Sequence, residues 1–163
     1  MEFLDVVDKN DKVVEKASKE DVYKKRLRHR IVHILIFNKK GEIALQLRSK
    51  EVSFCPHHWS TAVGGHVQSG ETCEEAALRE YEEELGVKSE IEFFSKDLYQ
   101  AEGTPEKFLI TFKTIYEGPF KINPSAVEEI EFFDMKTVQN MINKGEKFHP
   151  ELLFLLRKHF GIK

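Results

Sequence analysis

The sequence predicts an α/β or α+β fold, in which helices are interleaved with the strands of a mixed sheet. Two observations predict it: β-branched apolar runs recur along the chain, and amphipathic segments with helical spacing separate or follow them. No repeat or Pro/Gly/Ser-rich linker interrupts this pattern. With 163 residues, of which 40% are hydrophobic, the chain is predicted to form one domain over residues 1–163.

Charge and cysteine content exclude several classes of protein. The 28 acidic residues against 25 Lys and Arg leave a net charge of −3, which predicts neither a nucleic-acid partner nor a disordered acidic tail. The two cysteines form no CxxC motif and no disulfide framework, so a reducing, cytoplasmic compartment is expected. The N-terminus lacks the basic-then-apolar pattern of a signal peptide, and no apolar run is long enough to span a bilayer. A soluble protein without a membrane partner is therefore expected.

The first half of the chain reads as strands with one short helix. Turn formers separate two β-rich runs, 3–7 and 13–17, which predicts a hairpin, and Ser18 is placed to cap a helix over 19–27. The β-branched stretch 30–38 predicts a strand buried on both faces, whereas the alternation in 42–48 predicts a half-buried strand. An irregular segment, 49–59, precedes a short strand over 60–63 and a diglycine loop at Gly64 and Gly65.

The second half contains the clearest helix of the chain. Thr72 and Glu75 match a capping box and Gly86 fits a left-handed C-terminal position, so a helix over 72–85 is predicted. On it, Leu78, Tyr81 and Leu85 form the expected core stripe. Further strands are predicted over 91–99, 108–116 and 128–134, and further helices over 136–143 and 150–160.

Three glutamates, Glu80, Glu83 and Glu84, lie within about 100° of arc on the predicted helix. Each like-charge pair at such spacing costs roughly 0.2–0.5 kcal/mol, so a cation is expected to neutralise them. Mg²⁺ takes carboxylate ligands and completes its octahedron with waters and substrate phosphate oxygens. Considered alone, the segment fits a solvated helical face with i,i+4 pairs better than a metal site. The glycines upstream favour the metal site, because residues without side chains let an ion or phosphate approach the backbone closely.

Residues 65–87 contain the pattern G-x5-E-x7-R-E-U-x-E-E-x-G-U, in which U is apolar and Tyr81 and Val87 take those positions. This pattern resembles the Nudix box, the signature of the Nudix hydrolases. Seven fixed positions within 23 residues make the match specific. The resemblance implies a Nudix-type α/β/α sandwich and a hydrolase that cleaves a small organic diphosphate, such as a nucleoside diphosphate linked to another group, with Mg²⁺ or Mn²⁺.

The same resemblance assigns roles to individual residues. Glu80, Glu83 and Glu84 are implied as metal ligands or proton acceptors, and the Gly64 carbonyl as a further ligand. Glu71 and Arg79 are implied as supporting residues that fix the loops around the helix. Glu128 or Glu129 stands where many relatives place another catalytic acid, and of the two we expect Glu129 to act; a surface pair at the start of a strand is the alternative. Arg48 is implied as a ligand of the substrate diphosphate, and its fork suits phosphate oxygens. A homodimer is common in the family.

The resemblance extends beyond the box to LRHR-x-V-H, FN-x-x-GEI-x-LQ-x-RS and W-x4-GGHV. These runs resemble the branch related to isopentenyl-diphosphate isomerase, which contains both isomerases and hydrolases. The isomerases carry an essential cysteine where this chain has Gly64, and they usually lose the box acids that are intact here. Hydrolase is therefore the expected activity. An isomerase, or a binding module without catalysis, remains the alternative.

Several smaller motifs leave alternatives open. His29 and His66 match metal-binding histidines of the isomerases, but the remaining ligands of that site are not evident here. Contact with substrate phosphate, which we expect, or hydrogen bonds to backbone are therefore favoured over metal binding. Residues 55–58, Cys-Pro-His-His, fit a zinc site or a loop beside the active site, and the absence of a second ligand pair favours the loop. The basic run 24–30 fits RNA contact, attraction of a polyphosphate or a solvated helix end.

Overall fold

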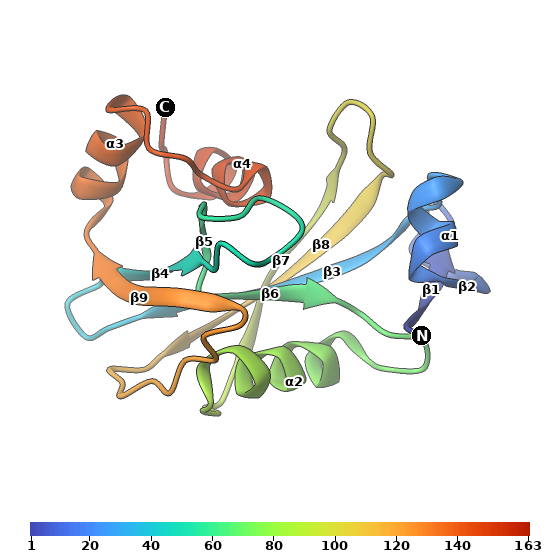
Figure 1. The fold of residues 1–163 in the computed structure, drawn as a ribbon, viewed down its shortest axis with the longest axis horizontal. Coiled ribbons are helices and arrows are strands. Elements are labelled where there is room, and N and C mark those ends of the chain that lie inside the picture. Colours follow the sequence, from blue (N-terminus) through green and yellow to red (C-terminus); the bar gives the residue numbers. More distant parts are fainter.

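The computed structural model describes residues 1–163 and contains a seven-stranded mixed sheet with helices on both faces (Figure 1). Helix α2 (Cys73–Leu85) lies against one face, and helices α3 (Met135–Asn143) and α4 (Pro150–His159) lie over the other. The predicted α/β/α sandwich is confirmed. None of the helices is both long and apolar enough to cross a membrane.

The sheet is ordered β5-β4-β3-β8-β7, with β6 added on β3 and β9 added on β4. Only β3 and β8 pair in parallel, and the other pairs are antiparallel. The strands are β3 (His29–Phe37), β4 (Ile43–Arg48), β5 (Trp59–Thr61), β6 (Val63–His66), β7 (Glu92–Tyr99), β8 (Lys107–Ile115) and β9 (Val127–Phe133).

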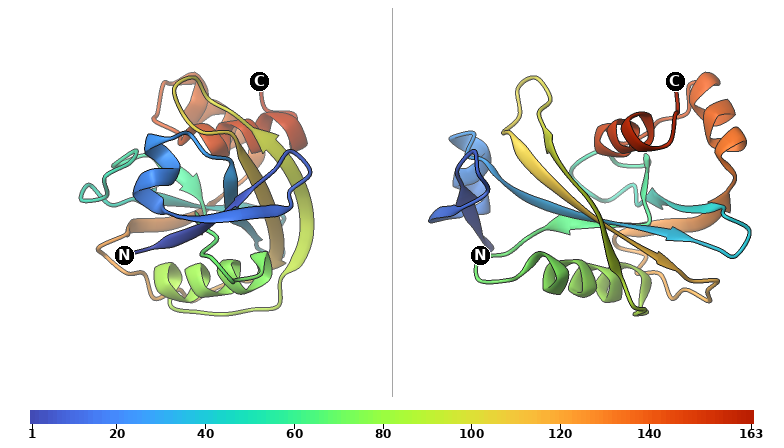
Figure 2. Two further views of the ribbon diagram at one scale, coloured as in Figure 1. Left: turned by 90° about the vertical axis from the view of Figure 1, so that its right-hand side faces the viewer. Right: turned by 180° about the vertical axis from the view of Figure 1, so that it is seen from behind.

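The predicted N-terminal hairpin forms a separate two-stranded sheet, β1 (Phe3–Val7) and β2 (Val13–Ser18), which stands beside the sandwich with helix α1 (Lys19–Lys24) (Figure 2). The Ser18 hydroxyl caps α1 by accepting the Asp21 N–H at 3.1 Å, as predicted. The expectation that this helix reaches residue 27 is wrong. It ends three residues earlier, because Arg26 has a left-handed φ of 54° that breaks the helical hydrogen-bond ladder.

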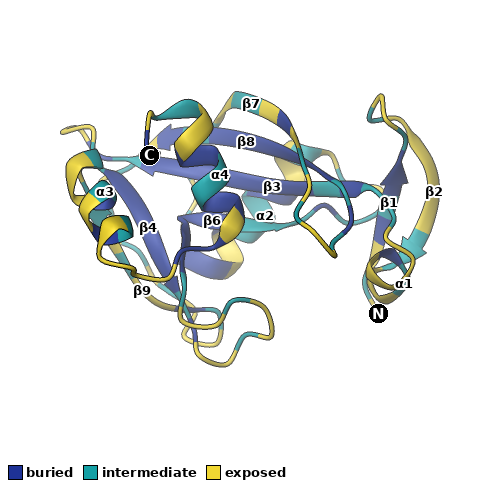
Figure 3. Ribbon diagram, turned by 90° about the horizontal axis from the view of Figure 1, so that it is seen from above, coloured by how far each residue is buried: buried dark blue, intermediate teal, exposed yellow.

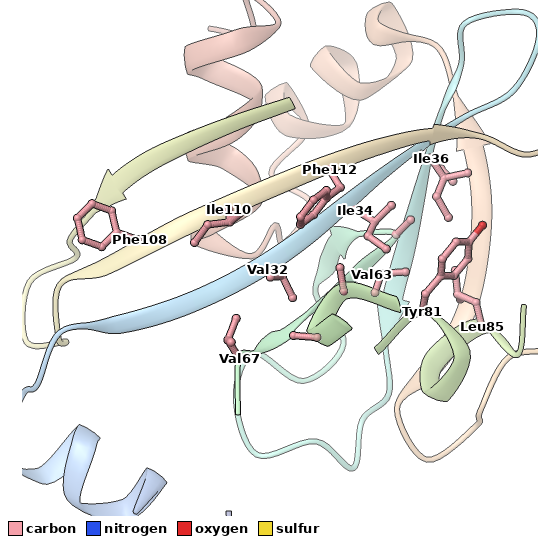
Figure 4. Packing of buried hydrophobic residues seen from close by; sticks show 14 of the residues in the cluster. Val32, Ile34, Ile36, Val63, Val67, Tyr81, Leu85, Phe108, Ile110 and Phe112 are labelled. Carbon is pink, nitrogen blue, oxygen red and sulfur yellow. The ribbon is translucent and has the colours of Figure 1, made fainter. Parts of the chain in front are cut away.

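Alternate residues of β3 serve the two cores of the sandwich. Val32, Ile34 and Ile36 pack toward α2, together with Tyr81 and Leu85 (Figure 4). The residues between them point toward α4, and β3 is buried along most of its length (Figure 3), so burial on both faces is confirmed. The prediction that β4 is half-buried is wrong, because α2 also covers its polar side, Ala44 and Gln46 included.

The predictions of one strand over 60–63 and of a loop at the two glycines are also wrong. Strand β5 ends at Thr61, and after Ala62 the chain continues as β6, in which Gly64 pairs with His33 and Gly65 with Val32. Along the same edge of β3, strand β4 pairs only at Phe37, so β4 and β6 diverge. Gly64 thus shares the α4 face of the sheet with His33, and Gly65 shares the α2 face with Val32.

Candidate active site

Helix α2 is fixed at both ends as the sequence predicts. Thr72 and Glu75 form the capping box, and Gly86 takes the left-handed conformation with φ 68°. The core stripe differs from the expected one, since Leu78 is only partly buried while Ala76 and Ala77 are fully buried. The buried face of α2 is therefore rotated toward the side of the helix that carries Glu80, Glu83 and Glu84.

Glu84 lies on this buried face and is only 9% exposed. Its Oε1 accepts a hydrogen bond of 2.6 Å from the Gln46 side-chain amide, which also donates to the Ala62 carbonyl at 2.8 Å. Burial first, and then the adjacent Glu80 carboxylate, raise the pKa of Glu84 well above 4.5. An acid held without a compensating cation at such a position is a candidate for metal binding or proton transfer.

Arg79 organises the remaining acids. Its Nε and Nη2 donate to the Glu71 carboxylate at 2.7 and 2.9 Å, its Nη1 to Glu80 at 2.7 Å, and its Nη2 also to the His66 carbonyl at 3.1 Å. Glu83 lies farther away, at 3.4 Å from Nη1. Arg79 and Glu71 thus join the loop before α2 to the helix itself, in the supporting arrangement expected of them.

A cavity of about 230 Å³ opens beside these acids. The structure brings together five residues predicted for the site, since Arg48, Gly64, Glu80, Glu83 and Glu84 all line it. The sequence reasoning did not identify four others on its wall, Gln46, Val52, Asn123 and Ala126.

The side chains of this cavity fit a hard divalent cation, because three carboxylates line it and such a cation takes oxygen ligands. No group of three or more His, Cys, Asp or Glu side chains is already arranged to hold an ion. Arg79 bonds Oε1 of Glu80 and Gln46 bonds Oε1 of Glu84, so each of these carboxylates keeps a second oxygen for a cation.

The structure does not bring Glu129 to this cavity. Glu129 is exposed on β9 and pairs with Leu47, whose side chain belongs to the core on the α4 side of the sheet. Directly paired residues share a face, so Glu129 points away from α2. A register shift at Arg48 separates it from its neighbour Glu128, which contacts His57 at 3.2 Å.

A second, larger cavity of about 530 Å³ adjoins the first and shares Arg48, Gly64 and Glu80 with it. His66 lines this larger cavity and accepts from or donates to the Tyr23 hydroxyl at 2.6 Å. His29 does not line it, because the rings of Tyr23 and His66 cover its fully buried side chain. Burial lowers the pKa of His29 to about 4 and that of His66 to about 3, so both are neutral at pH 7.

Residues 55–58 form part of a loop beside the two cavities. Val52 of this loop lines the smaller cavity, and Ser53 and Phe54 line the larger one. The His58 Nδ1 bonds the Pro56 carbonyl at 2.8 Å, which favours the loop over the zinc alternative.

The basic run 24–30 divides into two parts. Lys24, Lys25 and Arg26 are exposed at the end of α1, as the alternative of a solvated helix end requires. Arg28 and Arg30 are partly buried, and they bind Glu106 at 2.6 Å and Asp11 at 2.7 Å, which disfavours a role for these two arginines toward a polyphosphate or RNA.

The sequence comparisons with known proteins identify one and the same family. Residues 27–156 match the NUDIX domain. The chain is 32% identical to an uncharacterized Nudix hydrolase of Yersinia pestis, over 80% of this chain and 71% of that protein. It is 28% identical to the Nudix hydrolase YfcD of Escherichia coli K12, over 93% and 83% of the two chains. The crystal structure of DR0079 from Deinococcus radiodurans superposes with a TM-score of 0.84 at 28% identity, covering 98% of this chain and 99% of that one. The chain carrying this acidic helix therefore belongs to the Nudix family and is a Nudix hydrolase.

Proposed function

We propose that residues 1–163 act as one divalent-metal-dependent domain that cleaves the diphosphate linkage of a nucleoside diphosphate-X or a related small organic diphosphate. The observation that carries this proposal is the shared cavity: three glutamates of α2, the Gly64 backbone and the Arg48 guanidinium meet at one wall. A divalent metal would neutralise the three carboxylates, and a phosphate oxygen of the substrate would pair with the Arg48 guanidinium.

The proposed ligands of Mg²⁺ or Mn²⁺ are Glu80, Glu83, Glu84 and the Gly64 carbonyl. When bound, such an ion neutralises charge on the phosphoryl group and lowers the pKa of a coordinated water. Glu83 is the proton acceptor that we favour. Its side chain is 56% exposed, against 17% for Glu80, so water reaches it more readily.

A substrate screen tests this function directly. Nucleotide sugars, dinucleoside polyphosphates, nucleoside triphosphates and isoprenoid diphosphates would each be incubated with Mg²⁺ or Mn²⁺, and the phosphate-containing products would be identified. Hydrolysis of a diphosphate linkage that EDTA abolishes supports the proposal. Absence of cleavage across all four classes with either metal contradicts it.

Arg48→Ala is expected to raise KM for the diphosphate substrate about tenfold and to change kcat little, the pattern of lost uniform binding. Arg48 lines both cavities, and only its Nε is engaged, donating to the Phe54 carbonyl at 3.0 Å. Its two terminal nitrogens therefore remain for phosphate oxygens. Steady-state kinetics with Arg157→Ala, an exposed arginine of α4, provides the control. An unchanged KM with a lower melting temperature would show that Arg48 only holds the 49–58 loop.

Within the family, we place the chain in the branch related to isopentenyl-diphosphate isomerase, on the sequence runs described above, but as a hydrolase. Isomerisation requires a second acid–base group on the opposite side of the alkene, and Gly64 has no side chain to supply it. We expect no catalytic incorporation of solvent deuterium into isopentenyl or dimethylallyl diphosphate. Mass spectrometry of the recovered diphosphates measures this, and deuterium uptake faster than in the enzyme-free control would contradict the hydrolase assignment.

A further inference from the structure

The larger cavity has a charged floor that the chemistry proposed for the smaller cavity does not use. The Glu151 carboxylate at the start of α4 accepts a hydrogen bond from Lys107 of β8 at 3.0 Å and another from His33 of β3 at 2.9 Å. Glu151 is 4% exposed, Lys107 5% and His33 3%. All three line the cavity, and all lie on the α4 face of the sheet.

Stability alone does not account for this network. Three ionisable groups lose their hydration here, and replacing a buried ion pair by apolar residues of similar volume is often neutral or stabilising. Away from the cavity the α4 face is apolar, for instance at Leu35 and Leu45, which pack with Leu152 of α4. The charged groups gather where the face borders the cavity, which points to a role toward an occupant of that cavity.

The network leaves hydrogen-bond donors at the cavity wall. The Lys107 ammonium has three N–H groups; Glu151 accepts one of them, and the ammonium also lies 5.5 Å from the centre of the Tyr23 ring. His149 precedes α4, and its Nδ1 accepts the Glu151 backbone N–H at 3.1 Å, so the ring proton is on Nε2. Burial lowers the pKa of His149 to about 4, which keeps that ring neutral with one donor. Phe54 lies edge-on to His149 at a ring distance of 5.2 Å and is 49% exposed, so it offers a flat apolar surface at the same cavity.

We infer that the larger cavity binds the group X of the diphosphate substrate, and that Lys107, fixed by Glu151, selects an X rich in hydrogen-bond acceptors, as in the sugar or base of a nucleotide, over a prenyl chain. This inference rests on the proposed function for the position of the diphosphate: Arg48, its proposed ligand, belongs to both cavities, as do the proposed metal ligands Gly64 and Glu80, so a diphosphate bound where the cavities meet directs X into the larger one. A prenyl group would cover the Lys107 and His149 donors without offering acceptors, which is unfavourable for buried donors.

Monophosphates that differ only in X test this selection without requiring turnover. Isothermal titration calorimetry with adenosine 5′-monophosphate, ribose 5-phosphate and isopentenyl monophosphate, in Mg²⁺, compares a nucleoside, a sugar and a prenyl group. We expect at least one of the first two compounds to bind at least about tenfold more tightly than isopentenyl monophosphate. A tenfold ratio corresponds to about 1.4 kcal/mol of binding free energy. Equal binding of all three, or tighter binding of the prenyl compound, would overturn the inference.

Lys107→Met is expected to remove that tenfold preference. Because it leaves the Glu151 carboxylate buried without its cation and could unfold the protein, the double variant Lys107→Met/Glu151→Leu is the companion, as it replaces the pair by apolar side chains of similar size. If either folded variant keeps the parent preference, Lys107 is not the selecting residue. Glu106→Gln, which changes a half-buried neighbour paired with Arg28, controls for nonspecific charge effects.

The outcome is separable from that of the proposed function. Selective nucleotide or sugar binding with no hydrolysis of any diphosphate would remove the proposed reaction and leave the cavity assignment standing. Hydrolysis restricted to prenyl diphosphates, with isopentenyl monophosphate the tightest ligand, would leave the reaction standing and remove the assignment of X.

Discussion

Glu83→Gln is expected to lower turnover of the diphosphate substrate by about 10²- to 10⁴-fold, the range that a general base contributes. Glu83 lines the smaller cavity, and Arg79 contacts it only at 3.4 Å, so its carboxylate is free to accept a proton or to bind metal. Glutamine keeps the shape and removes both capacities. Turnover at saturating substrate and Mg²⁺ measures the effect.

Glu82→Gln is the matched control, because it makes the same substitution on the neighbouring residue of α2. Glu82 is exposed, pairs with Lys88 at 2.7 Å and does not line the cavity. Its variant should keep parent turnover. Similar turnover in the two variants, whether both fall or both persist, would contradict the assignment of Glu83.

Gly65→Ala is expected to lower turnover by about 10²-fold, an effect comparable to misplacing a reacting group by about 1 Å. A Cβ on Gly65 would lie 2.6 Å from the Glu80 Oε1 and 2.7 Å from its Cγ. The Glu80 side chain must therefore move away from the position in which Arg79 holds it. The glycine is required by this close approach, since its backbone is ordinary strand and carries no positive φ.

Gly64→Ala provides a graded comparison on the same strand. Its Cβ would lie 3.3 Å from the His33 ring, a milder contact than the one at Gly65, so a smaller loss of turnover is expected. Thermal unfolding of both variants separates lost activity from lost fold. Parent turnover in a folded Gly65→Ala variant would show that the position of Glu80 does not matter to the reaction.

The parts of the site that sequence predicted correctly depend on local spacing. The capping box, the left-handed Gly86 and the arc of Glu80, Glu83 and Glu84 are properties of one helix, and helical geometry fixes them without knowledge of the sheet. The place of Arg48 beside Gln46 at the cavity likewise follows from local spacing, because strand residues two apart share a face.

The parts of the site that the sequence did not predict depend on pairing between distant segments. Gly64 and Gly65 read as a loop, and only their pairing with β3 makes them a strand. Glu129 was expected at the metal site, whereas the register of β9 against β4 turns it to the other face. The Lys107 and Glu151 pair joins residues 44 positions apart; the one local signal for that floor was a histidine, His33, within an otherwise apolar run.

The most direct measurement is the free energy of unfolding of the parent and of Glu84→Gln, each in EDTA and in Mg²⁺. The folded-state pKa of Glu84 is raised above 4.5, so the stability attached to this group is fully present below pH 4.5 and is lost as pH rises through the folded pKa. At pH 7 in EDTA the free energy of unfolding of the variant should therefore equal that of the parent or exceed it by a few tenths of a kcal/mol. This is roughly the cost of one like-charge pair on a helix.

In Mg²⁺ at about 100 times its Kd, the parent should gain about 2.7 kcal/mol and the variant clearly less, because one ligand of the ion has been removed. This pair of results would establish that the acids of α2 gather to hold a metal. A Glu84→Gln variant that is less stable than the parent in EDTA, and that gains as much from Mg²⁺ as the parent does, would contradict it.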